Sequence, residues 1–371
     1  MPSSQSVTAA PDARRRKLAV IRPNHAFYVA TAIAAVTALV IKLGGGAPTL
    51  VFVFSAAAIA GLAWLIGLST ERLGASVGPR ISGVLNVTFG NAAEIVITLF
   101  ALHQGLFTLV KASITGSILG NLLLVLGMSM FLGGVRHGEQ RFSRSVAGMN
   151  ASMLTIAVIG LIVPAVFANS LPSANRDAVV HLSTGIAIVL MVTYLLSLVF
   201  FFRTPRAGGE TSSHAEAPIW TVPHSIAVLL AAAAGLTVLS EILVGSIEPV
   251  LKQWNLSEAF VGLILVPIVG NAAEHLVAVQ LAARNKMEFS MVISLGSSLQ
   301  VALFVAPLLV FLSRLFGAPL DLVFTPLEII TVTLGVLIVT IIANDGRSNW
   351  LEGAQLLAVY TIVALAFWFD P

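Results

Sequence analysis

The sequence contains no cysteine and little charge. Without thiols, disulfide bonds and thiolate metal sites are excluded. Only 10% of the 371 residues are charged and 57% are hydrophobic, whereas soluble domains carry about 25% charged residues. Mean hydropathy is +0.96. This composition predicts an all-α polytopic membrane protein and argues against a soluble domain.

Long polar stretches are scarce, because apolar runs of roughly 20 residues or more, the length that spans a bilayer, occupy most of the chain. We predict about eleven transmembrane helices, at 25–43, 48–69, 81–104, 110–134, 144–168, 178–202, 221–247, 258–282, 288–314, 323–343 and 351–369. Residues 1–24, with the basic run Arg14–Lys17, are predicted to be a cytoplasmic tail. A cleaved or twin-arginine signal is the alternative for that segment.

Lysine and arginine are distributed unevenly between the two sides that these helices define. With the N-terminus inside, 15 of the 20 basic residues fall in inner segments. The five outer ones are Lys42, Lys111, Arg176, Lys252 and Arg314. This bias is typical of the positive-inside rule. We therefore predict a multi-pass protein of the bacterial inner membrane, with a cytoplasmic N-terminus and no role in nucleic-acid binding.

One pentapeptide occurs twice within long apolar runs. Gly90–Glu94 and Gly270–Glu274 both read Gly-Asn-Ala-Ala-Glu, 180 positions apart, and Gly116-Ser117 matches Gly296-Ser297 at the same offset. The longest polar segment, 203–220, separates the second to sixth predicted helices from the seventh to eleventh, so each half has five helices and the first helix belongs to neither. An odd number of helices requires the second copy to enter the membrane from the opposite side, as in the inverted repeats of secondary transporters.

These features divide the chain into five parts. We predict a cytoplasmic tail at 1–24, an extra helix at 25–47, a first inverted repeat at 48–202, a cytoplasmic linker at 203–220 and a second inverted repeat at 221–371.

The repeated pentapeptide places a glutamate at mid-span, which costs about 2.5–3.5 kcal/mol on insertion scales. Asn91 and Glu94 share a helix face, as do Asn271 and Glu274. No lysine or arginine within either span could neutralise the glutamates, and only His275 is near. The other polar groups are oxygen donors, which favours a hard cation such as Ca²⁺ over zinc.

Structural explanations remain open for the uncharged polar residues. A serine in a membrane helix usually bonds to its own backbone, and an asparagine can join two helices. A buried carboxylate with a purely structural role requires a cationic partner, and neither glutamate has a lysine or arginine in its span. We therefore predict a functional role for the two glutamates first.

The repeats carry a family resemblance. Residues 262–275 resemble the second repeat signature of the calcium/proton exchangers, the CAX branch of the cation/Ca²⁺ exchanger superfamily, and 85–94 resembles the first. Gly296–Gln300 and Arg347–Gly353 are also similar to family segments. The resemblance extends from the second helix to the C-terminus. It implies exchange of Ca²⁺ for H⁺ at Glu94 and Glu274, with no enzymatic activity and no cofactor.

The resemblance also implies roles for further residues. Supporting oxygens are expected from Asn91, Asn271, Ser117, Ser298 and Gln300. It implies proton handling by His275 and an access path along Glu71 and Glu241. Sodium-coupled relatives carry Ser/Thr-rich signatures in place of Asn-Ala-Ala, so protons are the expected coupling ion. The linker holds only Glu210 and Glu216, so the acidic regulatory helix of many relatives is not expected.

The alternatives belong to other functional classes. An antiporter exchanging Na⁺ or K⁺ for H⁺ would share the fold, and a cation channel would need no inverted repeat. An intramembrane hydrolase would require a motif such as His-Glu-x-x-His, which the sequence does not contain. Ca²⁺, H⁺ and the lipid bilayer are the expected partners, and the oligomeric state, homo-oligomer included, is left open.

Overall fold

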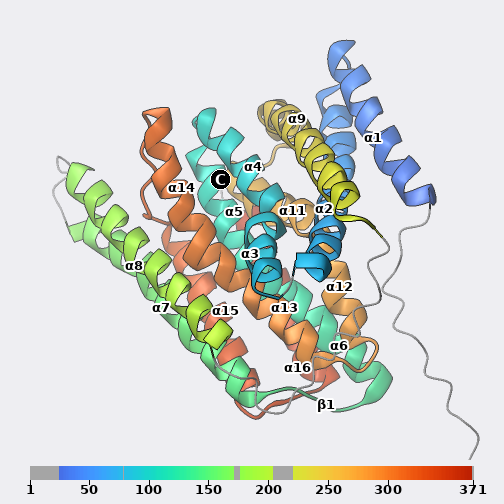
Figure 1. Ribbon diagram of the computed structural model, residues 1–371. Helices are drawn as coiled ribbons and strands as arrows, with labels where there is room; N and C mark the ends of the chain where they lie inside the picture. The colour runs from blue at the N-terminus through green and yellow to red at the C-terminus, as the bar shows by residue number, and fades with distance from the viewer. Residues whose placement is uncertain (1–24, 78, 171–175, 204–219, 370–371) are drawn as a thin grey trace, which may run out of the picture.

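The computed structural model describes residues 25–77, 79–170, 176–203 and 220–369. In these residues the protein is a helical bundle, with two-residue strands β1 (Gln140–Arg141) and β2 (Arg347–Ser348) at one end (Figure 1). The predicted tail, 1–24, lies outside the described residues, and so does almost all of the predicted linker.

Nine helices in the described part of the chain are long and apolar enough to cross a membrane. Seven of them are uninterrupted. Five of these seven are α1 (His25–Leu43), α2 (Pro48–Val77), α9 (Val222–Trp254), α15 (Pro326–Ala343) and α16 (Trp350–Phe369). Two more, α7 (Arg144–Ser170) and α8 (Arg176–Arg203), form an antiparallel pair. The prediction of an all-helical polytopic membrane protein is confirmed.

The remaining two of these nine spans each contain a π-helical turn. One consists of α5 (Phe107–Leu119), η1 (Gly120–Val125) and α6 (Leu126–His137). The other consists of α13 (Met287–Gln300), η3 (Val301–Val305), α14 (Ala306–Ser313) and the 3₁₀ turn η4 (Arg314–Phe316). Such π-turns are frequent near functional sites. In this structure each begins within a turn of Ser117 or Ser297.

Two predicted spans, 81–104 and 258–282, are broken into half-helices. The first is α3 (Pro79–Gly90) followed by α4 (Ala92–His103). The second comprises α10 (Glu258–Phe260), η2 (Val261–Leu265) and α11 (Val266–Gly270), followed by α12 (Ala272–Ala282). Its two parts meet at 67°, and counting them as one span gives ten candidate spans among the described residues.

Both breaks occur at the asparagine of the repeated pentapeptide. Asn91 has φ −99° and ψ 17°, and Asn271 has φ −103° and ψ 9°, so neither residue continues the α-helix. The preceding glycine contributes no side chain to stiffen the turn. The predicted span 81–104 is therefore interrupted, and α4, with 12 residues, is too short to cross a bilayer alone.

The helix crossings closest to the break at Asn271 depend on small residues. A Cβ on Gly116 of α5 would clash with the backbone carbonyl of Leu263, and a Cβ on Gly262 would lie 2.6 Å from the carbonyl oxygen of Leu109. Glycine at such contacts lets two membrane helices approach backbone to backbone. Helix α5 is thus pressed against η2.

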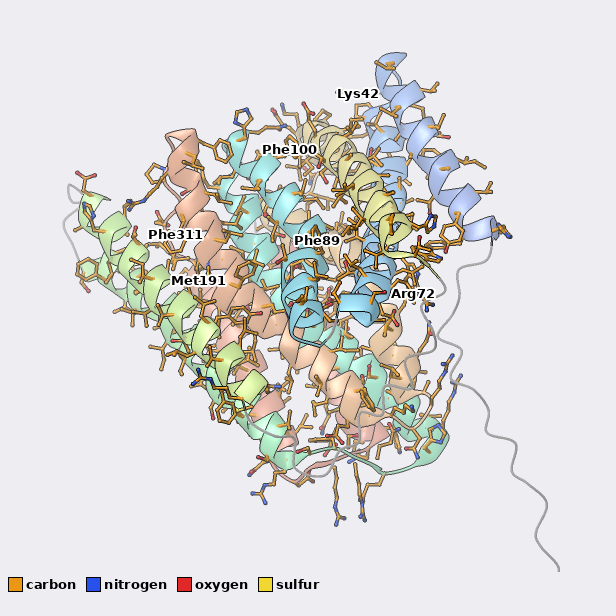
Figure 2. All side chains as sticks on the ribbon, viewed as in Figure 1. Lys42, Arg72, Phe89, Phe100, Met191 and Phe311 are labelled. Carbon is orange, nitrogen blue, oxygen red and sulfur yellow. The ribbon has the colours of Figure 1, made fainter. Side chains whose placement is uncertain are left out.

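Several basic residues can be placed relative to the two ends of the bundle. Lys111, in the first turns of the span 107–137, forms an ion pair with Asp321. At the opposite end of that span, Arg347 of β2 lies 3.3 Å from Glu139. Figure 2 shows Lys42 high in the view and Arg72 well below it. Which end faces the cytoplasm stays a prediction.

Candidate cation site

The two helix breaks face each other across the bundle. A Cβ on Gly90 would lie 3.4 Å from Oε1 of Glu274, and a Cβ on Gly270 would lie 3.1 Å from Cγ of Glu94. The glycine of each pentapeptide therefore packs against the glutamate of the other. The convergence of the two copies, expected from the repeat, is present in the structure.

Glu94 is the more enclosed of the two glutamates, with 3% of its surface exposed. Asn271 donates a 2.6 Å hydrogen bond from Nδ2 to Oε1 of Glu94. Ser117 of α5 donates a hydrogen bond from its hydroxyl to the same oxygen. Three elements, α4, α5 and the break before α12, thus fix this carboxylate.

Glu274 is half-buried and has a serine beside it at the equivalent position. Ser297 of α13 lies next to its carboxylate. Asn121 in turn donates from Nδ2 to the Ser297 hydroxyl at 3.0 Å. Ser117 and Ser297 are 180 residues apart, like the glutamates, so each carboxylate meets the serine of its own half.

The two asparagines are oriented with their carbonyl oxygens free. Asn91 donates from Nδ2 to Oε1 of Gln300 at 2.7 Å, and Asn271 uses its amide nitrogen on Glu94. Four buried acceptor atoms at the breaks have no donor among the described residues: Glu94 Oε2, Glu274 Oε2, Asn91 Oδ1 and Asn271 Oδ1.

Buried acceptors without donors are costly unless a ligand, ion or water completes them. Carboxylate and amide oxygens are the ligands of hard cations such as Ca²⁺. The described residues contain no group of three or more His, Asp or Glu side chains that could hold a resident metal. Two carboxylates and several uncharged oxygens are the ligand types of a hard-cation site.

Ser298 hydrogen-bonds the backbone in this structure, and its role as a ligand stays a prediction. Its hydroxyl donates to the backbone carbonyls of Ile118 and Ser294, at 3.3 and 3.1 Å. Ser297, its neighbour, occupies the place beside Glu274. The 180-residue offset from Ser117 is the signal in the sequence that points to Ser297.

The predicted accessory acids do not join the buried cluster. Glu71 of α2 and Glu241 of α9 are exposed side chains. His275 follows Glu274 directly, and its Nε2 is buried without a hydrogen-bond partner in the described part of the chain. Its role in proton handling stays a prediction.

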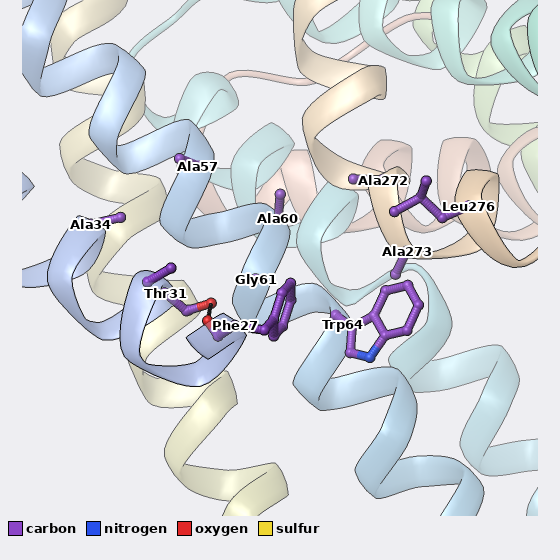
Figure 3. A pocket seen from close by; sticks show the side chains of 11 residues that line it. Phe27, Thr31, Ala34, Ala57, Ala60, Gly61, Trp64, Ala272, Ala273 and Leu276 are labelled. Atoms are coloured by element: carbon purple, nitrogen blue, oxygen red, sulfur yellow. Dashed lines mark hydrogen bonds between the residues drawn. The ribbon is translucent and has the colours of Figure 1, made fainter. Parts of the chain in front are cut away.

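A separate apolar cavity of about 210 Å³ lies between α1, α2 and α12. Figure 3 shows Phe27 and Trp64 on one side of it and Ala272, Ala273 and Leu276 on the other. Its wall consists mostly of alanine and aromatic side chains, so it lacks the oxygen ligands of a cation site.

The comparisons with known proteins agree with this arrangement. The family model described as sodium/calcium exchanger protein matches residues 47–203 and 224–369. This chain belongs to that family. A Ca²⁺/H⁺ antiporter of Synechocystis is 43% identical over 350 residues, which cover 88% of this chain and 93% of the relative. The Ca²⁺/H⁺ antiporter ChaA of Bacillus subtilis is 41% identical over 350 residues, which cover 93% of this chain and 99% of the relative. The resemblance to the CAX branch is confirmed.

Solved structures of similar proteins share the fold. The structure of native YfkE has a TM-score of 0.81 and 38% sequence identity, covering 93% of this chain and all of the other. A structure described as the H⁺/Ca²⁺ exchanger CAX has a TM-score of 0.69 at 14% identity, covering 91% and 90%. The second likeness shows the fold alone. The family and the curated relatives place this chain among transporters rather than enzymes.

Proposed function

We propose that this protein exchanges Ca²⁺ for H⁺ across the membrane, and that Glu94 and Glu274 bind the two ions in competition. The observation that carries the proposal is the set of four buried oxygen acceptors that the two helix breaks hold without donors. The names of the relatives from Synechocystis and Bacillus subtilis support Ca²⁺ and H⁺ as the ions.

The charges of the site account for coupling. Two carboxylates balance one divalent cation, and without a cation two negative charges in a poorly hydrated site repel each other. Protons relieve that repulsion by neutralising the carboxylates, and they also remove the charge that Ca²⁺ needs. Binding of Ca²⁺ therefore releases protons, and one site serves both ions without a separate proton pathway.

Alternating access requires the site to open to each side in turn. We place the site between inverted repeats at 48–202 and 221–371, each contributing one broken span. Support comes from the two separate ranges that the family model matches and from the position of both breaks at the same pentapeptide. Half-helices that meet at a cation site are typical of secondary transporters.

The test is uptake of ⁴⁵Ca by proteoliposomes that contain the purified protein, with an imposed pH gradient and no sodium. The proposal expects saturable uptake that collapses when the gradient is dissipated. Uptake that requires a Na⁺ or K⁺ gradient would assign the other antiporter class, and non-saturating flux without counter-transport would indicate a channel. We further propose that the protein resides in the bacterial plasma membrane with its N-terminus in the cytoplasm.

A further inference from the structure

The two carboxylates of the site are not equally accessible. Glu94 is 3% exposed, and its Oε1 already accepts hydrogen bonds from Asn271 and Ser117. Glu274 is half-buried, although its Oε2, like Oε2 of Glu94, is buried without a donor among the described residues. Of the two residues, Glu274 is therefore the more exposed.

The half-helices that lead to the two breaks also differ in how well they are covered. In α3, Ile81 is 53% exposed and Asn86 is exposed, and Figure 1 shows α3 at the front of the bundle. In the corresponding part of the second motif, Val261, Leu263 and Val266 are 0–2% exposed. Of these two half-helices, α3 is the less covered one, and it leads to Gly90, which packs against Glu274.

Asn86 stands on that approach. Its Oδ1 lies 3.7 Å from the position that a Cβ on Gly90 would take, and Oε1 of Glu274 lies 3.4 Å from the same position. Asn86 precedes Gly90 by four residues and so shares its helix face. Because Gly90 has no side chain, nothing from that residue separates the amide oxygen from the carboxylate oxygen.

We propose that Asn86 Oδ1, together with Glu274, is the first ligand of the cation on the side of the membrane where α3 begins. This inference rests on the proposed exchange function and adds a residue to its site. An amide oxygen is a normal Ca²⁺ ligand and, unlike a third carboxylate, does not take up a proton in exchange. It can therefore hold the arriving cation without altering the number of protons released.

The subsite is present on one side only. The residue 180 positions after Asn86 is Val266, which is 2% exposed and has no oxygen in its side chain. The inference therefore distinguishes the two sides of the membrane. Losing Asn86 weakens capture of Ca²⁺ from the α3 side and leaves capture from the other side unchanged.

The experiment compares wild type with Asn86→Val, which copies the residue of the second motif, in proteoliposomes of defined protein orientation. The Ca²⁺ concentration for half-maximal exchange is measured separately from each side. On the α3 side we expect it to rise by about fivefold to tenfold, the equivalent of one lost polar contact. Maximal rate and the value for the opposite side should stay within about twofold, a change below 0.5 kcal/mol.

Ile81→Val is the matched control, because Ile81 is an exposed residue of the same half-helix and carries no oxygen. This variant should have the wild-type Ca²⁺ concentration for half-maximal exchange on both sides of the membrane. Asn86→Ser retains an oxygen on a shorter side chain and should give an intermediate rise. If Asn86→Val does not yield folded protein, the half-maximal Ca²⁺ concentration of Asn86→Ser on the α3 side tests the proposal instead.

The outcomes separate this inference from the proposed function. Wild-type protein without pH-driven Ca²⁺ uptake would remove the function itself. Active wild type, combined with an unchanged half-maximal concentration in either Asn86 variant, would overturn only the role of Asn86. An equal rise on both sides would also overturn it, because a general loss of packing would act without sidedness.

Discussion

Asn271 donates a 2.6 Å hydrogen bond to Glu94, a residue 177 positions earlier in the chain. Each of the two belongs to a different copy of the same pentapeptide, so the bond joins the halves of the protein at their breaks. The glutamate that binds the cation in our proposal is therefore oriented by the opposite half. Any motion that separates the halves alters the ligand geometry at the same time.

Replacing either glutamate by glutamine should abolish exchange. Glu94→Gln and Glu274→Gln keep the side-chain volume but remove a charge that balances Ca²⁺ and an oxygen that takes up a proton. Folding should persist, because a neutral amide is easier to bury than a carboxylate. The measurement is pH-driven ⁴⁵Ca uptake, with elution of a single species from a sizing column as the check on folding.

Glu248→Gln is the matched control for that pair. Glu248 is an exposed glutamate of α9 that lies 2.7 Å from Lys252. Its replacement should leave uptake at the wild-type level, since exposed ion pairs contribute little. Full uptake by Glu94→Gln or Glu274→Gln would contradict the shared-site mechanism.

Apparent affinity for Ca²⁺ should fall as the pH is lowered. Ca²⁺ requires ionised carboxylates and protons convert them to the neutral form, so binding releases protons. A plot of log Kd against pH should therefore fall with a slope of about one to two, the number of protons displaced. Glu274→Gln, if it retains measurable binding, should reduce the slope by about one for the same reason.

Equilibrium binding by isothermal titration calorimetry between about pH 5.5 and 8 provides this slope. Buffers with different ionisation enthalpies report the number of protons released independently. A Kd that does not change with pH would exclude competition at one site.

Much of the fold follows from composition and apolar run length, because a bilayer sets how long a spanning helix must be. The starts of α1, α2 and α9 fall within one residue of the predicted limits. The predicted limits of two spans run straight through the breaks at Asn91 and Asn271. Hydropathy averages over many residues and is insensitive to the φ and ψ of one residue.

The candidate site was predictable where a repeat exposed it and not elsewhere. Glu94 and Glu274 stand out because both copies carry them at mid-span. Asn86 has no polar counterpart in the second repeat, so comparison of the halves could not single it out. The contact of Ser297 with Glu274 depends on which face α13 presents to the break, a result of packing between distant segments.

The neighbouring serines of α13 should have different effects on transport. Ser297→Ala removes the hydroxyl that lies next to the Glu274 carboxylate, and a hydrogen bond to a charged group contributes about 1.5–3 kcal/mol. We expect apparent Ca²⁺ affinity to fall by roughly tenfold or more, since the ionised carboxylate loses a donor. Ser298→Ala removes bonds to backbone carbonyls that remain paired within their helices, so its effect should be below about threefold.

Ca²⁺-dependent uptake at fixed pH measures both variants, and each is the other's control because they differ by one position. A larger loss in Ser298→Ala than in Ser297→Ala would contradict the contacts described here. It would favour the ligand set that the family resemblance implies.

The close crossing of α5 and η2 should make Gly262 sensitive to a single methyl group. A Cβ at this position would lie 2.6 Å from the Leu109 carbonyl oxygen and 2.8 Å from Cβ of Ala112, so the helices must separate to admit it. Overpacking of this kind typically costs about 1–3 kcal/mol. We expect Gly262→Ala to lower Tm in detergent by several degrees.

Gly245→Ala is the contrasting variant. Gly245 lies inside α9, and a Cβ there would meet nothing within 4 Å. Alanine stabilises a helix interior relative to glycine by up to about 1 kcal/mol, so Tm should stay the same or rise. If Gly262→Ala were as stable as Gly245→Ala, the close backbone approach of α5 to η2 described here would be contradicted.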